Sequence, residues 1–145
     1  MPGPYTVDAS VFLNAFNPRE TGHTLSRRFL VEVQTQAVPL ITPTLALPEV
    51  AAAVRRGRGD AALARSFALA LQRLPQVVWM PLDEALARRA VEVAALYALR
   101  GSDAVYAAVA LQFGATLVTL DQEQRERVKP ALKALSPEKA LAEMG

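Results

Sequence analysis

The sequence predicts a three-layer α/β protein, in which helices cover both faces of a central parallel sheet of four to five strands. The chain has 145 residues, of which 52% are hydrophobic and 21% are charged, and this suits one folded domain with a single core. Short apolar segments alternate with longer amphipathic segments, as expected for parallel strands joined by helices. We therefore expect residues 1–145 to form a single domain.

The first strand is expected at Tyr5–Val7, and an acid follows it directly. Asp8 separates this strand from a helix over Ala9–Phe16, which the next two residues, asparagine and proline, end. Ser10 either caps this helix or turns its hydroxyl group toward whatever Asp8 binds. Asp8 itself is either the first residue of an Asx-type turn or part of a functional site.

The middle of the chain predicts two further strands and four helices. An amphipathic helix is expected over about 21–37, and His23, the only histidine, is interpreted as the residue that enters it. Because there is no second imidazole and no serine or cysteine nucleophile pattern, a histidine-based triad is not expected. The other elements are a strand over 39–42, a helix from 43 to about 56, a helix to about 74 capped by Asp60, a strand over 76–80 and a helix over 84–99 capped by Asp83.

Glu49 is a second acid of interest, near the start of the helix expected over 43–56. It follows Pro48, which a helix tolerates only in or near its first turn. Glu49 is either an ordinary solvated residue or an acid that faces the same edge as Asp8. Cations and glycines at the end of this helix are explained by helix capping more readily than by contact with RNA.

Residues 100–121 predict a helix rich in small residues, then a glycine turn and an apolar strand. Ser102 is a good N-cap residue, which places Asp103 in the first turn, where the helix dipole favours a carboxylate. Gly114 is expected to end the helix in a left-handed conformation. A single helix face should carry Asp103, Tyr106, Ala107, Ala110 and Phe113, so that small side chains bring Asp103 close to the sheet.

The last predicted strand before the carboxyl-terminal region is Thr116–Leu120, and Asp121 stands at its carboxyl end. Ligands of open α/β sheets bind beyond such strand ends. Plainer alternatives are a capping role for Asp103 and a turn or N-cap role for Asp121. A short helix over 122–128 should follow, Pro130 should interrupt the chain after it, and a terminal helix should begin at 136–137 with proline in its first turn.

Composition excludes several classes of protein. The absence of cysteine excludes disulfides, thiolate catalysis and a cysteine zinc site. A formal net charge of +2, from 16 basic and 14 acidic residues, does not by itself indicate a nucleic-acid ligand. The sequence shows no basic and apolar leader and no apolar run long enough to span a bilayer, so we expect a soluble cytoplasmic protein without a membrane partner.

Four acids could meet at one edge of the predicted sheet: Asp8, Glu49, Asp103 and Asp121. Two carboxylates about 4 Å apart, at an effective dielectric constant near 20, repel each other by roughly 4 kcal/mol. Such a cluster needs cations or protons, and oxygen ligands alone suit a hard cation such as Mg²⁺ or Mn²⁺. Ions held there could activate water and stabilise the leaving oxygen during phosphodiester cleavage.

Four motifs in this order resemble the PIN domain, specifically the VapC-like toxin ribonucleases of bacterial toxin–antitoxin pairs. They are VDASVF at 7–12, LPEV at 47–50, GSDAVYAAVA at 101–110 and LVTLD at 117–121. The resemblance covers essentially the whole chain, and although each motif alone is weak, the ordered set is fairly specific.

The resemblance implies an endoribonuclease that depends on Mg²⁺ or Mn²⁺ and uses the four acids as metal ligands and catalytic residues. It implies that Ser10 supports the first acid, that Thr119 is the hydroxyl residue before the last, and that both contact the substrate region together with Arg100. Glu123 stands where some relatives carry a further Asp or Asn, which leaves a fifth acidic ligand open. The implied partners are RNA, further copies of the chain in a homodimer or a higher homo-oligomer, and a small VapB-like antitoxin that can place an arginine or lysine at the acids.

Other functions compete with this hypothesis. A phosphatase with an aspartate nucleophile would need an acid at position 10, where Ser10 stands, and a receiver domain would need a lysine after the last strand. A catalytically silent PIN-fold module for RNA binding or dimerisation is the other alternative, although unpaired clustered carboxylates would cost such a module stability. Candidate cations for an RNA groove are Arg27, Arg28, Arg55, Arg56, Arg58, Arg100 and Arg125, most of which a solvated helix surface explains equally well.

Overall fold

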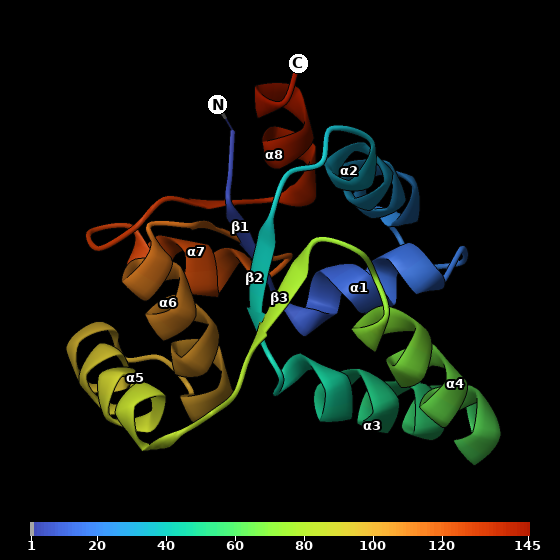
Figure 1. Cartoon of the computed structure of the whole chain (residues 1–145), viewed down its shortest axis with the longest axis horizontal. Helices are drawn as coiled ribbons and strands as arrows, with labels where there is room; N and C mark the ends of the chain where they lie inside the picture. The colour runs from blue at the N-terminus through green and yellow to red at the C-terminus, as the bar shows by residue number, and fades with distance from the viewer. Residues whose placement is uncertain (1) are drawn as a thin grey trace.

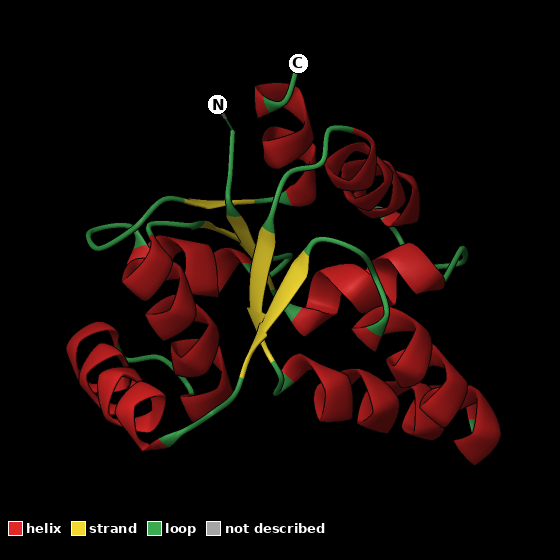
Figure 2. Cartoon of the chain, in the orientation of Figure 1, coloured by secondary structure: helices red, strands yellow, loops and turns green. Residues whose placement is uncertain are grey.

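A single five-stranded sheet lies at the centre of the protein, as a computed structural model that describes residues 2–145 shows (Figures 1 and 2). The first residue of the predicted domain lies outside this range. All neighbouring strands are parallel, in the order β3-β2-β1-β4-β5. The strands are β1 (Tyr5–Val7), β2 (Leu40–Pro43), β3 (Val77–Met80), β4 (Thr116–Val118) and β5 (Ala134–Leu135).

Helices cover the two faces of this sheet, so that the predicted three-layer α/β architecture is confirmed. In Figure 1, α5 and α6 lie on one side of the strands, and α1, α2, α3 and α4 lie on the other. The helices are α1 (Ala9–Phe16), α2 (His23–Thr35), α3 (Ala46–Arg58), α4 (Ala61–Gln72), α5 (Glu84–Tyr97), α6 (Gly101–Phe113), α7 (Gln122–Val128) and α8 (Pro137–Glu143).

Most predicted caps are confirmed by hydrogen bonds. Asp60 accepts from the amide of Leu63, and Asp83 accepts from the amide of Leu86. The third helix begins later than expected, at Ala46, because Pro43 still pairs with Met80 in the sheet. Helix α5 ends at Tyr97 rather than near 99, because the next residue takes a left-handed conformation with φ of 55°.

Helix α6 differs from the prediction in its first residue and in the exposure of its last one. It begins at Gly101 and not after Ser102, because Arg100 is extended, with ψ of 153°, and its carbonyl accepts the first helical hydrogen bond from Ala104. Asp103 still lies in the first turn, as predicted. Phe113 does not belong to the buried face, since 38% of it is exposed.

The centre of α6 is buried on every side, which a single apolar stripe would not require. Every residue from 104 to 110 is at most 6% exposed. Helix α5 packs on one side of α6, and strands β1, β2 and β4 pack on another. Small side chains allow this double approach because they keep the helix axis close to both neighbours. Gly114 ends the helix in the left-handed region, with φ of 61°, as predicted.

The chain after Pro130 completes the sheet. Leu117 donates its amide hydrogen to the carbonyl of Lys133 at 3.0 Å, and Thr119 donates to the carbonyl of Leu135 at 3.1 Å. These bonds form β5, a strand that the sequence alone did not reveal. No helix within residues 2–145 is both long and apolar enough to cross a membrane.

Candidate acidic site at the carboxyl end of the sheet

Asp8 is the most deeply buried acid of the predicted site. It is the N-cap residue of α1 without a side-chain capping bond, so its carboxylate is available for other contacts. Ser10 Oγ donates to Asp8 Oδ2 at 2.8 Å, and Thr119 Oγ1 donates to the same oxygen at 2.7 Å. Asp8 is 8% exposed, and Thr119 is fully buried. Two hydroxyl groups therefore fix one oxygen of this carboxylate.

Thr119 joins β4 to the beginning of α7. The backbone amide of Asp121 donates to Thr119 Oγ1 at 3.2 Å, and Gln124 Oε1 lies 3.1 Å from the same hydroxyl oxygen. The backbone amide of Leu120 donates to Ser10 Oγ at 3.3 Å. These contacts place Ser10 and Thr119 between the first and the last predicted acids. In the described structure, both hydroxyl groups point to protein atoms of the site.

Glu49 is held by Tyr106, which was predicted to share a helix face with Asp103 but was not predicted to belong to the site. Tyr106 Oη donates to Glu49 Oε1 at 2.6 Å, from the buried face of α6 to the first turn of α3. Tyr106 is fully buried, while Glu49 is half-buried. Its position three residues after Asp103 was the available signal, because residues at this spacing share a helix face.

Asp103 and Asp121 are joined by one arginine. Arg100 Nε lies 3.7 Å from Asp103 Oδ2, and Arg100 Nη2 lies 3.8 Å from Asp121 Oδ2. The arginine side chain is 81% exposed, whereas the Asp103 side chain is 19% exposed. Asp121 also caps α7, because its Oδ1 accepts from the amide of Gln124 at 3.1 Å. The plainer interpretation of Asp121 as an N-cap thus holds together with its place in the cluster.

The electrostatics indicate that the acids act on one another. Burial, together with the carboxylates of Asp8, Asp121 and Glu49, raises the pKa of Asp103 to about 6, although Arg100 lowers it. Burial also raises the pKa of Asp8, the hydroxyls of Thr119 and Ser10 lower it, and Asp121 raises it. The pKa of Glu49 is likewise raised by burial and by Asp8, and it is lowered by the hydrogen bond from Tyr106. The ionisation of one of these carboxyl groups therefore makes the ionisation of its neighbours less favourable.

A cavity of about 530 Å³ opens between α1 and α3 and is lined by Asp8, Ser10, Glu49 and Arg56. As the side chains stand, no three carboxylate or histidine residues among residues 2–145 lie close enough together to hold one ion. The donors nevertheless fit a hard cation in their chemistry, since all are carboxylates whose ionisation is mutually opposed. A divalent cation would relieve that opposition.

The predicted cations fall in different places. Arg56 lines the acidic cavity, and Arg125 Nη1 donates to the carbonyl of Thr119 at 2.7 Å. Arg58 lies over the ring of Phe16, 5.6 Å from its centroid. Arg27, Arg28 and Arg55 are exposed on helix surfaces. Glu123 forms an ion pair with Arg127 on the surface of α7.

Comparisons with known proteins agree with this fold. The sequence profile of the PIN domain matches residues 5–130. No curated protein matches the sequence significantly. The structure of VapC20 from Mycobacterium tuberculosis, described as a sarcin-ricin loop cleaving toxin, is 18% identical, with a TM-score of 0.73 over 89% of this chain and 96% of that chain.

Two further solved structures show the same likeness. The protein PAE2754 from Pyrobaculum aerophilum is 22% identical, with a TM-score of 0.71, and the match covers 97% of this chain and 88% of that chain. VapBC2 from Rickettsia felis, solved bound to a DNA fragment from its promoter, is 16% identical, with a TM-score of 0.67 over 91% and 97% of the two chains. At these low identities, the structural likeness shows a common fold and no more.

Proposed function

The chain belongs to the PIN domain family, and we propose that it is an endoribonuclease that depends on Mg²⁺ or Mn²⁺. The observation that carries the proposal is the mutual opposition of its acids, in which Asp8, Asp121 and Glu49 all raise the pKa of Asp103. If these residues had only a structural role, the repulsion between their carboxylates would lower the stability of the protein with no compensating function. A cation-binding site explains why they lie together.

The proposed ligands are Asp8, Glu49, Asp103 and Asp121, and their supporting residues determine what each one can do. When bound there, a divalent ion supplies an activated water and positive charge beside the leaving oxygen of a phosphodiester. The hydrogen bonds from Ser10 and Thr119 to one oxygen of Asp8 fix the orientation of this carboxylate.

The remaining groups position the other acids and the substrate. Tyr106 fixes one oxygen of Glu49, which lines the cavity. Arg100 stands at the exposed rim beside Asp103 and Asp121, where its guanidinium group can bind a substrate phosphate. Ser10 and Thr119 act in this proposal by holding Asp8 beside the substrate.

The proposed biological role is the toxin of a VapBC-type pair. The fold likeness to VapC20 and to VapBC2 supports a toxin role and a small antitoxin as the partner. We also propose that residues 1–145 form one PIN domain, that two copies form a homodimer, and that the protein acts on RNA in the cytoplasm. A small reading frame immediately upstream would support the antitoxin, and co-purification of its product would test it.

The test of the catalytic proposal is cleavage of labelled RNA by the purified protein without antitoxin. Wild-type protein should cleave with Mg²⁺ or Mn²⁺ and not with EDTA, whereas Asp8→Asn and Asp103→Asn should lose cleavage and keep the circular dichroism spectrum of the fold. Asp60→Asn is the matched control, because it makes the same change at the cap of α4 and asparagine caps helices about as well as aspartate. Cleavage that persists in the two site variants would rule out the assignment.

A further inference from the structure

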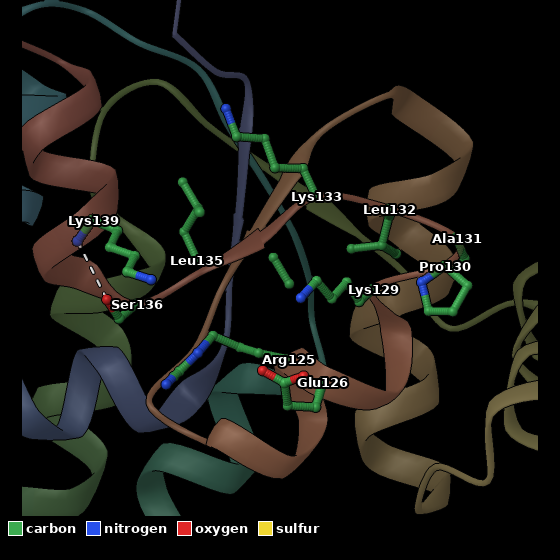
Figure 3. Close-up of a pocket in the computed structure, with 11 residues that line it drawn as sticks. Arg125, Glu126, Lys129, Pro130, Ala131, Leu132, Lys133, Leu135, Ser136 and Lys139 are labelled. Carbon is green, nitrogen blue, oxygen red and sulfur yellow. Dashed lines mark hydrogen bonds between the residues drawn. The ribbon is translucent and has the colours of Figure 1, made fainter.

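A second cavity, of about 600 Å³, lies beside β5 and α7 and is strongly cationic (Figure 3). Arg125, Lys129, Lys133 and Lys139 line it, and within residues 2–145 Glu126 is the only acid that does so. In Figure 3, the side chains of Lys129 and Lys139 extend toward one another, the side chain of Arg125 runs below them, and the side chain of Lys133 points upward and away. None of these lysines belongs to the motifs that identified the acidic site.

Three of the four cations have no carboxylate counter-ion. Lys133 forms an ion pair with Glu143, but Arg125, Lys129 and Lys139 form no ion pair among residues 2–145. Both of the latter lysines are exposed on the surface. Lysine ammonium groups without a carboxylate partner attract anions from solution, and two of them beside an arginine around one cavity favour a phosphate group.

This cationic cavity is connected to the acidic site through Thr119. Arg125 Nη1 donates to the carbonyl of Thr119 at 2.7 Å, and the carbonyl of Leu135, another lining residue, accepts from the amide of Thr119 at 3.1 Å. The hydroxyl of the same threonine donates to Asp8. One buried residue therefore separates the wall of the cavity from the most buried acid.

We propose that the cationic cavity binds a backbone phosphate of the RNA substrate, next to the bond that is cleaved. This proposal rests on the function proposed above. The acidic site repels the polyanionic strand, so a cleavable RNA needs cations that hold its neighbouring phosphates, and this cavity offers them at the edge of the sheet beyond β4. Arg125 contacts both the strand end and the cavity, and it aligns the two sites.

The test compares RNA binding by two double variants with the same change in charge. Lys129→Ala/Lys139→Ala removes two exposed cations of the cavity, and Arg65→Ala/Arg73→Ala removes two exposed cations of α4 as the matched control. Fluorescence anisotropy of a labelled single-stranded RNA in EDTA reports binding without cleavage. If circular dichroism shows that the alanine variant is altered, Lys129→Gln/Lys139→Gln replaces it.

We expect the Kd of the cavity variant to rise roughly tenfold at 50 mM salt. Its slope of log affinity against log salt should become shallower by about 0.7, as for one lost phosphate contact on a single strand. The control should change neither quantity. If the cavity variant and the control bind RNA with equal affinity and equal salt slope, the proposal is overturned. The ligand of the cavity would then be a free anion or an acidic protein segment, and calorimetry with inorganic phosphate would distinguish these two. Wild-type protein that binds RNA through the cavity but never cleaves it would contradict the proposed function alone.

Discussion

Replacing Asp103 by asparagine should stabilise the metal-free protein at neutral pH, although it removes a proposed ligand. The carboxyl group has its pKa raised from 3.8 to about 6 in the folded chain. A rise of this size corresponds to roughly 3 kcal/mol against the ionised form. Because the side chain is still 19% exposed, solvent screens part of the effect, and we expect about 1 to 3 kcal/mol.

The sign of this effect depends on pH. Between pH 3.8 and about 6 the folded chain binds more protons at Asp103 than the unfolded chain, so the free energy of unfolding falls as pH rises through that window. Asparagine does not titrate and avoids this loss. The gain in free energy of unfolding of Asp103→Asn over wild type should therefore be largest at pH 7 and should be small at pH 4.

Urea denaturation in EDTA at pH 7 and at pH 4 measures both free energies. Asp60→Asn, the same substitution at the exposed cap of α4, serves as the control and should change stability little at either pH. The claim that the acids oppose one another would be refuted if Asp103→Asn were less stable than wild type at pH 7. It would also be refuted if the variant changed the free energy of unfolding by the same amount at both pH values.

Two further substitutions test the residues that hold the acids. Tyr106→Phe removes the hydrogen bond to Glu49, so the free energy of unfolding measured with urea should fall by about 1 kcal/mol, and kcat for RNA cleavage should fall several-fold at unchanged KM. The matched variant Tyr97→Phe on α5 should change neither quantity. An unchanged kcat in Tyr106→Phe would contradict the role of Tyr106. Thr119→Val removes a donor that lowers the pKa of Asp8, so the acidic limb of the pH profile of cleavage should move to higher pH, and a limb that stays in place would argue against this support.

The strand ends were the part of the site that the sequence could predict. Asp8 follows β1 directly, and Asp121 stands close behind β4, which ends at Val118 and not at Leu120 as predicted. Strands of a parallel sheet end at a common edge. Asp103 was predicted in the first turn of α6 even though the cap was misplaced from Arg100 to Ser102, because a two-residue error at a helix start still leaves Asp103 in the first turn.

Contacts between distant segments could not be predicted. Tyr106 and Glu49 are 57 residues apart, and the hydrogen bond between them depends on how α6 and α3 meet at the sheet. Strand β5 has only two residues and exists because β4 supplies its hydrogen-bond partners. The lysines of the cationic cavity are each ordinary exposed residues, and only the path of the chain around β5 brings them together with Arg125.

The central claim is that the four acids form one cation-dependent centre that cleaves RNA. The most direct measurement is the initial rate of cleavage of one labelled RNA by metal-free protein as Mg²⁺ is added back, for wild type and for Asp8→Asn in parallel. Our account predicts no cleavage without the ion, a rate that rises and saturates with Mg²⁺ for wild type, and no recovery for Asp8→Asn. Cleavage by wild type in EDTA, or full recovery by Asp8→Asn, would contradict it.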